Sequence, residues 1–236
     1  MIERDLPLPD GLVAEWTKFL VTDSERPTGE DMYLDIFNHG LLFPLQRSFE
    51  CAAMIGTARK EIRSIRCVME IGADKGGGFY HWVKGFPYVH KAIACEYRGV
   101  PYIPAFENAF PNVQFLGLPD SSYDSVAVGK VRKFLDGEQL DCLFIDGDKS
   151  GTSKDFEAYL PLMRPGGLVF IHDINAEIHA RSFFFSLHGR FRLALLLDGR
   201  EGKAMQESKQ APQSGYEGWL KIWGTTSCGV GVVYTP

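Results

Sequence analysis

The sequence has few of the features expected of a membrane, secreted or nucleic-acid-binding protein. No stretch approaches the roughly 20 apolar residues that a membrane-spanning helix needs. The N-terminus, MIERDLPLPDG, is acidic and broken by prolines, and it lacks the apolar stretch of a signal peptide. No block of Lys and Arg offsets the net charge of −5, so we expect no binding to nucleic acid. These absences predict a cytoplasmic protein without a membrane anchor.

Cysteine is also scarce, and its spacing is uninformative. The five cysteines are an odd number and contain no CxxC pair; they are Cys51, Cys67, Cys95, Cys142 and Cys228. Three of them lie inside apolar runs, which is typical of small buried side chains in a reducing compartment. The spacing therefore favours neither a disulfide framework nor a zinc site.

What the sequence does contain is enough apolar material for a full core. Hydrophobic residues make up 45% of the 236 positions and charged residues 23%, an ordinary globular composition. Residues 1–66 have helix-type spacing, with one amphipathic stretch over 12–21 and another helix expected to begin after Ser48. We expect a helical N-terminal extension over 1–66 and one large domain over 67–236.

From residue 67 the chain alternates short apolar runs with longer helical or loop stretches. None of the runs alternates cleanly between polar and apolar residues, which is typical of strands covered on both faces. This order predicts an α/β fold with a Rossmann-like, doubly wound and mostly parallel sheet. The runs are CVMEIG (67–72), KAIACE (91–96), VQFLGL (113–118), DCLFID (141–146) and GLVFIHD (167–173).

The C-terminal part completes a seven-stranded sheet. We expect a helix over 176–188, whereas the pattern of 192–198 allows either a helix or a strand. The segments 218–224 and 228–234 flank a short turn and predict an antiparallel hairpin.

A glycine-rich loop, EIGADKGGG (70–78), directly follows the first predicted strand. Phosphate, dinucleotide and S-adenosylmethionine loops all have this general form. A Walker loop, GxxxxGK[ST], ends in a Lys-Ser/Thr pair, and no such pair follows Gly72, so that interpretation is disfavoured. The dinucleotide fingerprint needs a glycine at Asp74, whose charge would also repel a pyrophosphate.

The loop resembles the first motif of the class I S-adenosylmethionine-dependent methyltransferases, an acidic residue followed by alternating glycines. Glu70, Gly72 and Gly76 match that motif, and Asp74 replaces its usual middle glycine. The resemblance implies S-adenosylmethionine as cofactor. A carboxylate at the strand end would help to hold the methionine ammonium, and glycines let the backbone approach the ligand.

Two further acidic residues extend the predicted cofactor site. Glu96 ends the next strand, where a doubly wound fold places an acid on ribose hydroxyls. Asp120 follows the third strand, where this fold contacts the adenine. The alternatives are a solvated strand-end acid for Glu96 and a helix N-cap for Asp120.

The stretch IDGDK…PGG…HD within residues 141–173 places Asp146 and the pair His172-Asp173 at two strand ends. The helix between these strands is expected to end in Pro165-Gly166-Gly167. Together with the glycine loop, this stretch resembles the small-molecule O-methyltransferases of class I, in particular the group that includes the cephalosporin hydroxylase-like proteins. That resemblance implies a Mg²⁺ or other divalent metal site at Asp146 and Asp173, with His172 where a carboxylate often stands. It also implies that Asp146 contributes to cofactor binding.

The resemblance predicts an O-methyltransferase for a small hydroxylated acceptor, a sugar or natural product, in which a metal ion at Asp146 assists the reaction. One alternative is a metal-independent enzyme with His172 as general base. Another is a methyltransferase-like protein that binds without turnover. Asp146 and Asp173 have simpler roles as turn or helix caps. The helical extension is a candidate element for a homodimer.

Overall fold

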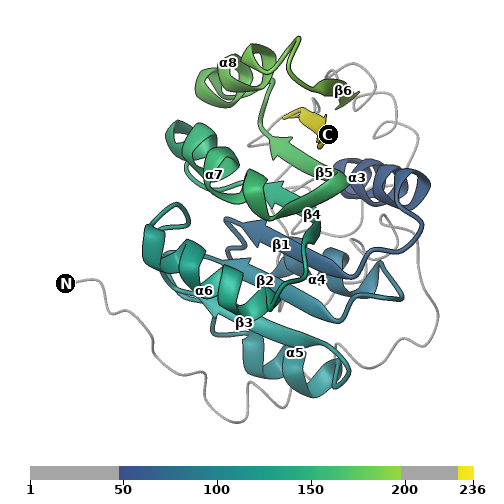
Figure 1. The fold of residues 1–236 in the computed structure, drawn as a ribbon, viewed down its shortest axis with the longest axis vertical. Coiled ribbons are helices and arrows are strands. Elements are labelled where there is room, and N and C mark those ends of the chain that lie inside the picture. Colours follow the sequence, from purple (N-terminus) through teal and green to yellow (C-terminus); the bar gives the residue numbers. More distant parts are fainter. Residues whose placement is uncertain (1–47, 198–227) are drawn as a thin grey trace, which may run out of the picture.

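The computed structural model describes residues 48–197 and 228–236, which form a seven-stranded sheet with helices on both faces (Figure 1). The strand order is β3-β2-β1-β4-β5-β7-β6, and β7 runs antiparallel to both of its neighbours. The strands are β1 (Cys67–Ile71), β2 (Lys91–Cys95), β3 (Gln114–Leu118), β4 (Leu140–Ile145), β5 (Met163–His172), β6 (Arg192–Leu197) and β7 (Val230–Tyr234).

Two apolar layers hold the helices against the sheet. One layer packs α3, α4 and α5 on one face, and the other packs α6, α7 and α8 on the opposite face. This arrangement confirms the doubly wound α/β fold. The helices are α3 (Ser48–Glu61), α4 (Gly77–Lys84), α5 (Ile103–Ala109), α6 (Ser125–Leu135), α7 (Thr152–Tyr159) and α8 (Ile178–Ser186), with 3-10 turns η1 (Lys149–Gly151) and η2 (Leu160–Leu162).

The central strands explain why the apolar runs did not alternate. Every residue of β1, β2 and β4 is buried, because helices cover both faces of these strands. The parallel registers align the ends of the first five strands at one edge of the sheet. The carboxyl edge of such a sheet is where open α/β folds bind ligands.

One predicted boundary was wrong. The helix before the fifth strand was expected to continue to Pro165-Gly166-Gly167, but α7 ends at Tyr159 and these three residues belong to β5. The register between β4 and β5 shifts in this region, and Gly166 has a φ of 72°. Pro165, Gly166 and Gly167 thus lie in the irregular first part of β5 rather than at the end of a helix.

The C-terminal strands resolve one open assignment. Residues 192–197 are a strand, β6, which pairs antiparallel with β7. The predicted first hairpin strand, 218–224, and the predicted helix over 12–21 lie outside the described residues. Ser48 does begin a helix, as expected. Cys67, Cys95 and Cys142 are free, buried thiols, as their apolar neighbours predicted.

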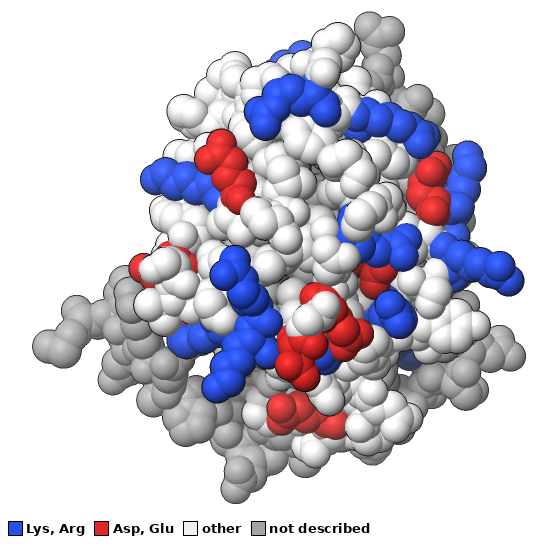
Figure 2. All heavy atoms as spheres, viewed as in Figure 1, with Lys and Arg blue, Asp and Glu red and all other residues white. Residues whose placement is uncertain are grey.

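Two surface observations bear on the expected partners. Within the described part of the chain, no helix combines the length and apolarity that crossing a bilayer requires. On the face shown in Figure 2, basic and acidic side chains are interspersed rather than gathered into one basic patch.

Candidate functional site

A cavity of about 580 Å³ opens at the carboxyl edge of the sheet. Its volume lies within the usual range for small-molecule sites. The ends of β1, β2, β4 and β5 and the loop after β3 contribute to its wall. Of the predicted site residues, the cavity is lined by Glu70, Gly72, Glu96, Asp120, Asp146, His172 and Asp173. Gly76 is not in the wall; it stands at the N-terminus of α4.

The glycines of the loop are required by close packing. Gly72 has a φ of 83°, and a Cβ there would lie 2.5 Å from the backbone carbonyl of Asp146. Gly76 has a φ of 85°, and a Cβ there would lie 2.9 Å from the Tyr102 ring. Asp74 adopts the left-handed region as well, with a φ of 40°. This explains why glycine is usual at that position and why Asp, which tolerates the region better than most residues, can replace it.

Glu70 is the most unusual group in the wall. Its side chain is 1% exposed, and neither carboxyl oxygen has a hydrogen-bond partner within the described structure. Burial, and then the negative charge of Asp146, raise the pKa of Glu70 well above its ordinary value. A buried carboxyl without a donor is costly, and a cationic ligand group in the cavity would relieve that cost.

Glu96 connects the glycine loop to β2. One carboxyl oxygen accepts from the backbone N–H of Asp74 at 3.2 Å, and the other accepts from Arg98 N–H at 3.0 Å. Since each carboxylate oxygen can accept a second hydrogen bond, these contacts leave room for ligand hydroxyls. The alternative of a merely solvated acid does not hold, because Glu96 is 8% exposed and bonded to the loop.

Asp120 also lines the cavity, but its carboxylate pairs with Lys130 at 2.8 Å on the exposed side of α6. It is not a helix cap. The N-cap of α6 is Asp124, whose side chain accepts from Val126 N–H. A contact between Asp120 and an adenine stays a prediction.

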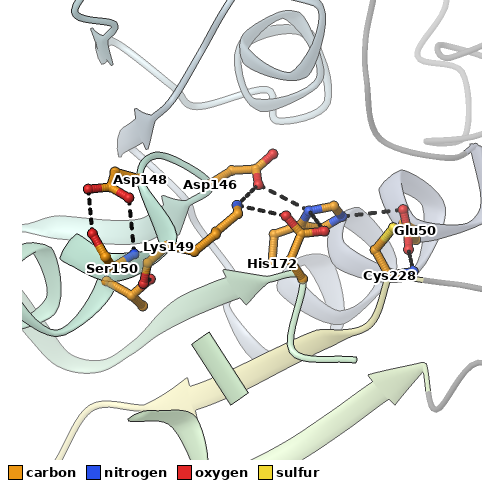
Figure 3. Close-up of polar contacts among 9 residues, drawn as sticks. Glu50, Asp146, Asp148, Lys149, Ser150, His172 and Cys228 are labelled. Carbon is orange, nitrogen blue, oxygen red and sulfur yellow. Dashed lines mark hydrogen bonds and ion pairs between the residues drawn. The ribbon is translucent and has the colours of Figure 1, made fainter. Parts of the chain in front are cut away.

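Asp146, His172 and Asp173 meet in the wall of the cavity, in a network of ion pairs. Figure 3 shows Asp146 and Lys149 beside His172. The Nδ1 atom of His172 lies 3.0 Å from Asp146 Oδ1 and 3.2 Å from Asp173 Oδ1. Neither aspartate caps a helix: the N-cap of α8 is Glu177, and Asp148 rather than Asp146 caps the turn η1. The structure thus brings together the three residues that the sequence nominated.

Two members of this network were missed by the sequence analysis. The ammonium of Lys149 bonds to Asp146 Oδ1 and lies 2.9 Å from Asp173 Oδ2. Glu50, from α3, lies 3.3 Å from His172 Nε2 and accepts from Cys228 N–H at 2.8 Å. Lys149 was visible in the IDGDK motif, three residues after Asp146. Glu50 had no such signal, since it stands 122 positions before its histidine partner.

The charges in this network support one another. Burial alone would raise the pKa of Asp146, but His172 and Lys149 outweigh it and hold that pKa below its usual value. Burial alone would lower the pKa of His172, but Asp146 and Glu50 raise it well above the ordinary value. Burial would likewise lower the pKa of Lys149, but Asp146 and Asp173 raise it. These pKa shifts favour the carboxylate of Asp146 and the protonated side chains of His172 and Lys149.

The same residues can be tested for their fit to a divalent metal ion. One ligand atom from each of Asp146, His172 and Asp173 lies within 4.8 Å of the others, a spacing suitable for a metal. However, Lys149 already bonds to both carboxylates, and both ring nitrogens of His172 face carboxylates. As arranged here, the set does not fit a hard cation such as Mg²⁺, which prefers free oxygen ligands. Metal binding stays a prediction.

Part of the chain is similar to a known protein family. Residues 69–174 match the sequence model of a family described as a methyltransferase domain. No curated protein sequence matches the chain.

Several solved structures share the fold. An O-methyltransferase from Bacillus cereus in complex with S-adenosylhomocysteine (SAH) is 17% identical at a TM-score of 0.55, covering 95% of this chain and 100% of that one. TomG from Streptomyces achromogenes, an O-methyltransferase of tomaymycin synthesis in complex with S-adenosylmethionine (SAM), is 15% identical at a TM-score of 0.51, covering 95% and 96%. MycE of the mycinamycin pathway, in complex with Mg and SAH, is 14% identical at a TM-score of 0.53, covering 90% and 55%.

Likeness at this level of identity establishes the fold alone, and the family match is confined to residues 69–174. Both agree with the resemblance found in EIGADKGGG and IDGDK. The family match, over residues 69–174, is to a methyltransferase domain and covers less than half of the chain.

Proposed function

We propose that this protein transfers the methyl group of S-adenosylmethionine to a hydroxyl oxygen of a small molecule, a sugar or natural product. The observation that carries the proposal is the buried Glu70 carboxyl, which lines the cavity and has no partner within the described structure. A protein seldom keeps such a group unless a ligand completes it. The solved O-methyltransferases of the same fold support this choice of chemistry.

The residues around the cavity suit the parts of this cofactor. Glu70 would accept hydrogen bonds from the methionine ammonium, a charge-assisted contact in a dry environment. The backbone at Gly72 can approach the ligand because no side chain stands in the way. Glu96 would accept from the ribose hydroxyls with the positions left by Asp74 and Arg98. Asp120 would lie near the adenine.

In the reaction, a lone pair of the acceptor oxygen forms the new C–O bond while the C–S bond of the sulfonium breaks. The electron pair of that bond stays on sulfur and gives S-adenosylhomocysteine. The hydroxyl proton passes to a base, for which Asp146 and His172 in the cavity wall are candidates. The protein contributes chiefly by holding donor and acceptor in line.

The role of a metal ion separates two versions of this proposal. The metal-assisted version is supported by the spacing of Asp146, His172 and Asp173 and by MycE, which shares the fold and was solved with Mg. The metal-independent version with His172 as base requires the histidine to give up a proton that its carboxylate neighbours stabilise. Asp146→Asn should cripple the metal-assisted reaction and spare the histidine-dependent one.

A protein that binds the cofactor without turnover is a separate possibility, suggested by Asp74 in the glycine loop. The cavity keeps its volume of about 580 Å³ with Asp74 in its wall, which favours an open cofactor site.

The test is a transfer assay with S-adenosylmethionine labelled in its methyl group and a panel of hydroxylated sugars, phenols and macrolides. The proposal predicts label in at least one acceptor and its loss in Glu70→Ala. Cofactor binding without transfer to any hydroxyl compound would favour the binding protein instead.

A further inference from the structure

We infer that the ammonium of Lys149 is the resident cation of this site and holds the place between Asp146 and Asp173 that a divalent metal ion would need. The inference rests on the proposed function, because that function places a cofactor beside these residues. The contacts of Lys149 and the test of metal binding do not require catalysis. It disagrees with the metal site that the sequence resemblance implied.

The contacts of Lys149 are those of a bound cation. Its Nζ atom bonds to Asp146 Oδ1 and lies 2.9 Å from Asp173 Oδ2, so it bridges the ends of two neighbouring strands. The three side chains are only 11% to 19% exposed. Ion pairs with so little solvent contact are weakly screened, and they persist at ordinary ionic strength.

The position of Lys149 in the chain explains why the ammonium lies there. Lys149 begins the 3-10 turn η1, directly after the loop that leaves β4 at Asp146. Asp148 caps that turn through its contacts with Ser150, which keeps the loop short and directs the lysine back across the strand ends (Figure 3). The side chain is therefore held from its backbone outward.

A metal ion and the Lys149 ammonium are mutually exclusive at this position. Each needs the oxygens of the same two carboxylates, and the two cations would repel each other at such short range. The third predicted ligand is also engaged, since Nε2 of His172 faces Glu50 at 3.3 Å and Nδ1 faces the aspartates. A divalent ion would have to displace the lysine and reorient the imidazole.

In a second cluster of metal-binding residue types, a lysine again pairs with the carboxylate. Cys67, His90 and Glu138 also place one ligand atom each within 4.8 Å, at the opposite edge of the sheet. There the ammonium of Lys91 lies 2.7 Å from Glu138. In both clusters a lysine already neutralises the carboxylate, so neither offers an open site.

The experiment measures Mn²⁺ binding by electron paramagnetic resonance, with Mn²⁺ as the probe of a hard-cation site. We compare the full-length protein with Lys149→Ala and with Lys149→Met, which keeps most of the side-chain volume. Lys133→Ala, an exposed position on α6, controls for the loss of one positive charge. The double variant Lys149→Ala/Asp173→Asn tests whether any new site lies between these residues, and circular dichroism confirms that each variant is folded.

The inference predicts that removing Lys149 tightens Mn²⁺ binding by about tenfold or more, because two carboxylates lose their cation. The gain should be absent in Lys133→Ala and should disappear in the double variant. Equal binding by wild type and Lys149→Ala would overturn the inference, and so would the absence of binding in both. The Mn²⁺ experiment contains no cofactor, so its outcome does not depend on the proposed methyl transfer. Failure of the proposed function would instead appear as an absence of S-adenosylhomocysteine binding.

Discussion

The two edges of the sheet both carry clusters of charged side chains, yet they differ in what those side chains contact. At the amino edge, Asp141 accepts from the backbone N–H groups of Arg66 and Cys67 at 2.7 and 2.9 Å and pairs with Arg164 at 3.1 Å. At the carboxyl edge, Glu70 is equally buried, has no partner within the described structure and lines a cavity.

The difference separates an acidic side chain whose partners belong to the fold from one that has none within the described structure. Pairing lowers the pKa of Glu138 at the amino edge, with the hydrogen bond from Lys91 as its largest cause. Burial raises the pKa of Glu70 at the carboxyl edge. A cluster of charges alone is thus a poor indicator of a site, whereas a buried acidic side chain without a partner beside a cavity is a better one.

The largest expected effect is the loss of stability in Asp141→Ala. This change leaves the backbone N–H groups of Arg66 and Cys67 and the Arg164 guanidinium without their acceptor, which should cost about 3 kcal/mol of the free energy of unfolding. Urea denaturation measures the loss. Asp141→Asn keeps an acceptor oxygen and should lose about half as much.

If the two edges of the sheet have separate roles, Asp141 should contribute little to ligand affinity. The folded fraction of Asp141→Ala should bind S-adenosylhomocysteine with wild-type affinity. A loss of affinity that matched the loss in a Glu70 variant would show that the two edges do not have separate roles.

The next effect is the loss of cofactor affinity in Glu70→Gln. The amide keeps the size of the side chain but cannot offer a negative charge to the ligand ammonium, so S-adenosylhomocysteine should bind about ten- to hundredfold more weakly. Isothermal titration calorimetry measures the change. Unaltered affinity would show that Glu70 does not bind the cofactor.

The raised pKa of Glu70 gives a prediction about pH. The folded protein without ligand retains a proton on Glu70 that the unfolded chain releases above its ordinary pKa, so the free energy of unfolding falls as pH rises toward the folded pKa. Binding of the ammonium favours the carboxylate, so binding should release a proton and affinity should increase with pH. Calorimetry in buffers of different ionisation enthalpy detects the proton, and Glu70→Gln should show no such release.

A smaller pH effect is expected at Asp155, which hydrogen-bonds Ser122 in the cavity wall. Burial raises the pKa of Asp155 to about 6, so its ionisation destabilises the folded state between the unfolded pKa and 6. The stability of Asp155→Asn relative to wild type should therefore grow by about 1 kcal/mol from pH 5 to pH 7. A constant difference across that range would contradict an ionisation that burial disfavours.

Much of the fold and several site residues could be predicted from the sequence. The features that could not be predicted have a physical reason. The buried strands appear as unbroken apolar runs, and the order of runs and helices gives the doubly wound fold. Glu70, Glu96, Asp146 and Asp173 could be nominated because parallel strands end at one edge, so residues at strand ends meet. Glu50 could not, because its contact with His172 depends on how α3 packs against the sheet.

The assignment left open at 192–198 and the one wrong boundary have a similar cause. The run 192–197 contains no turn or cap to separate helix from strand, and only its pairing with β7 decides the matter. Pro165 and the glycines after it were assigned to a helix end, but they begin a strand whose register slips. Lys149 is part of the IDGDK motif, but its contacts with Asp146 and Asp173 depend on the direction of its side chain, which the sequence does not show.

The most direct measurement is a calorimetric titration of the wild-type protein with S-adenosylhomocysteine, first in metal-free buffer and then with Mg²⁺. Binding at one site per chain with the same affinity in both buffers is the predicted result, because Glu70 supplies the missing charge and Lys149 the resident cation. No binding in either buffer would contradict the assignment of this cavity as a methyltransferase cofactor site.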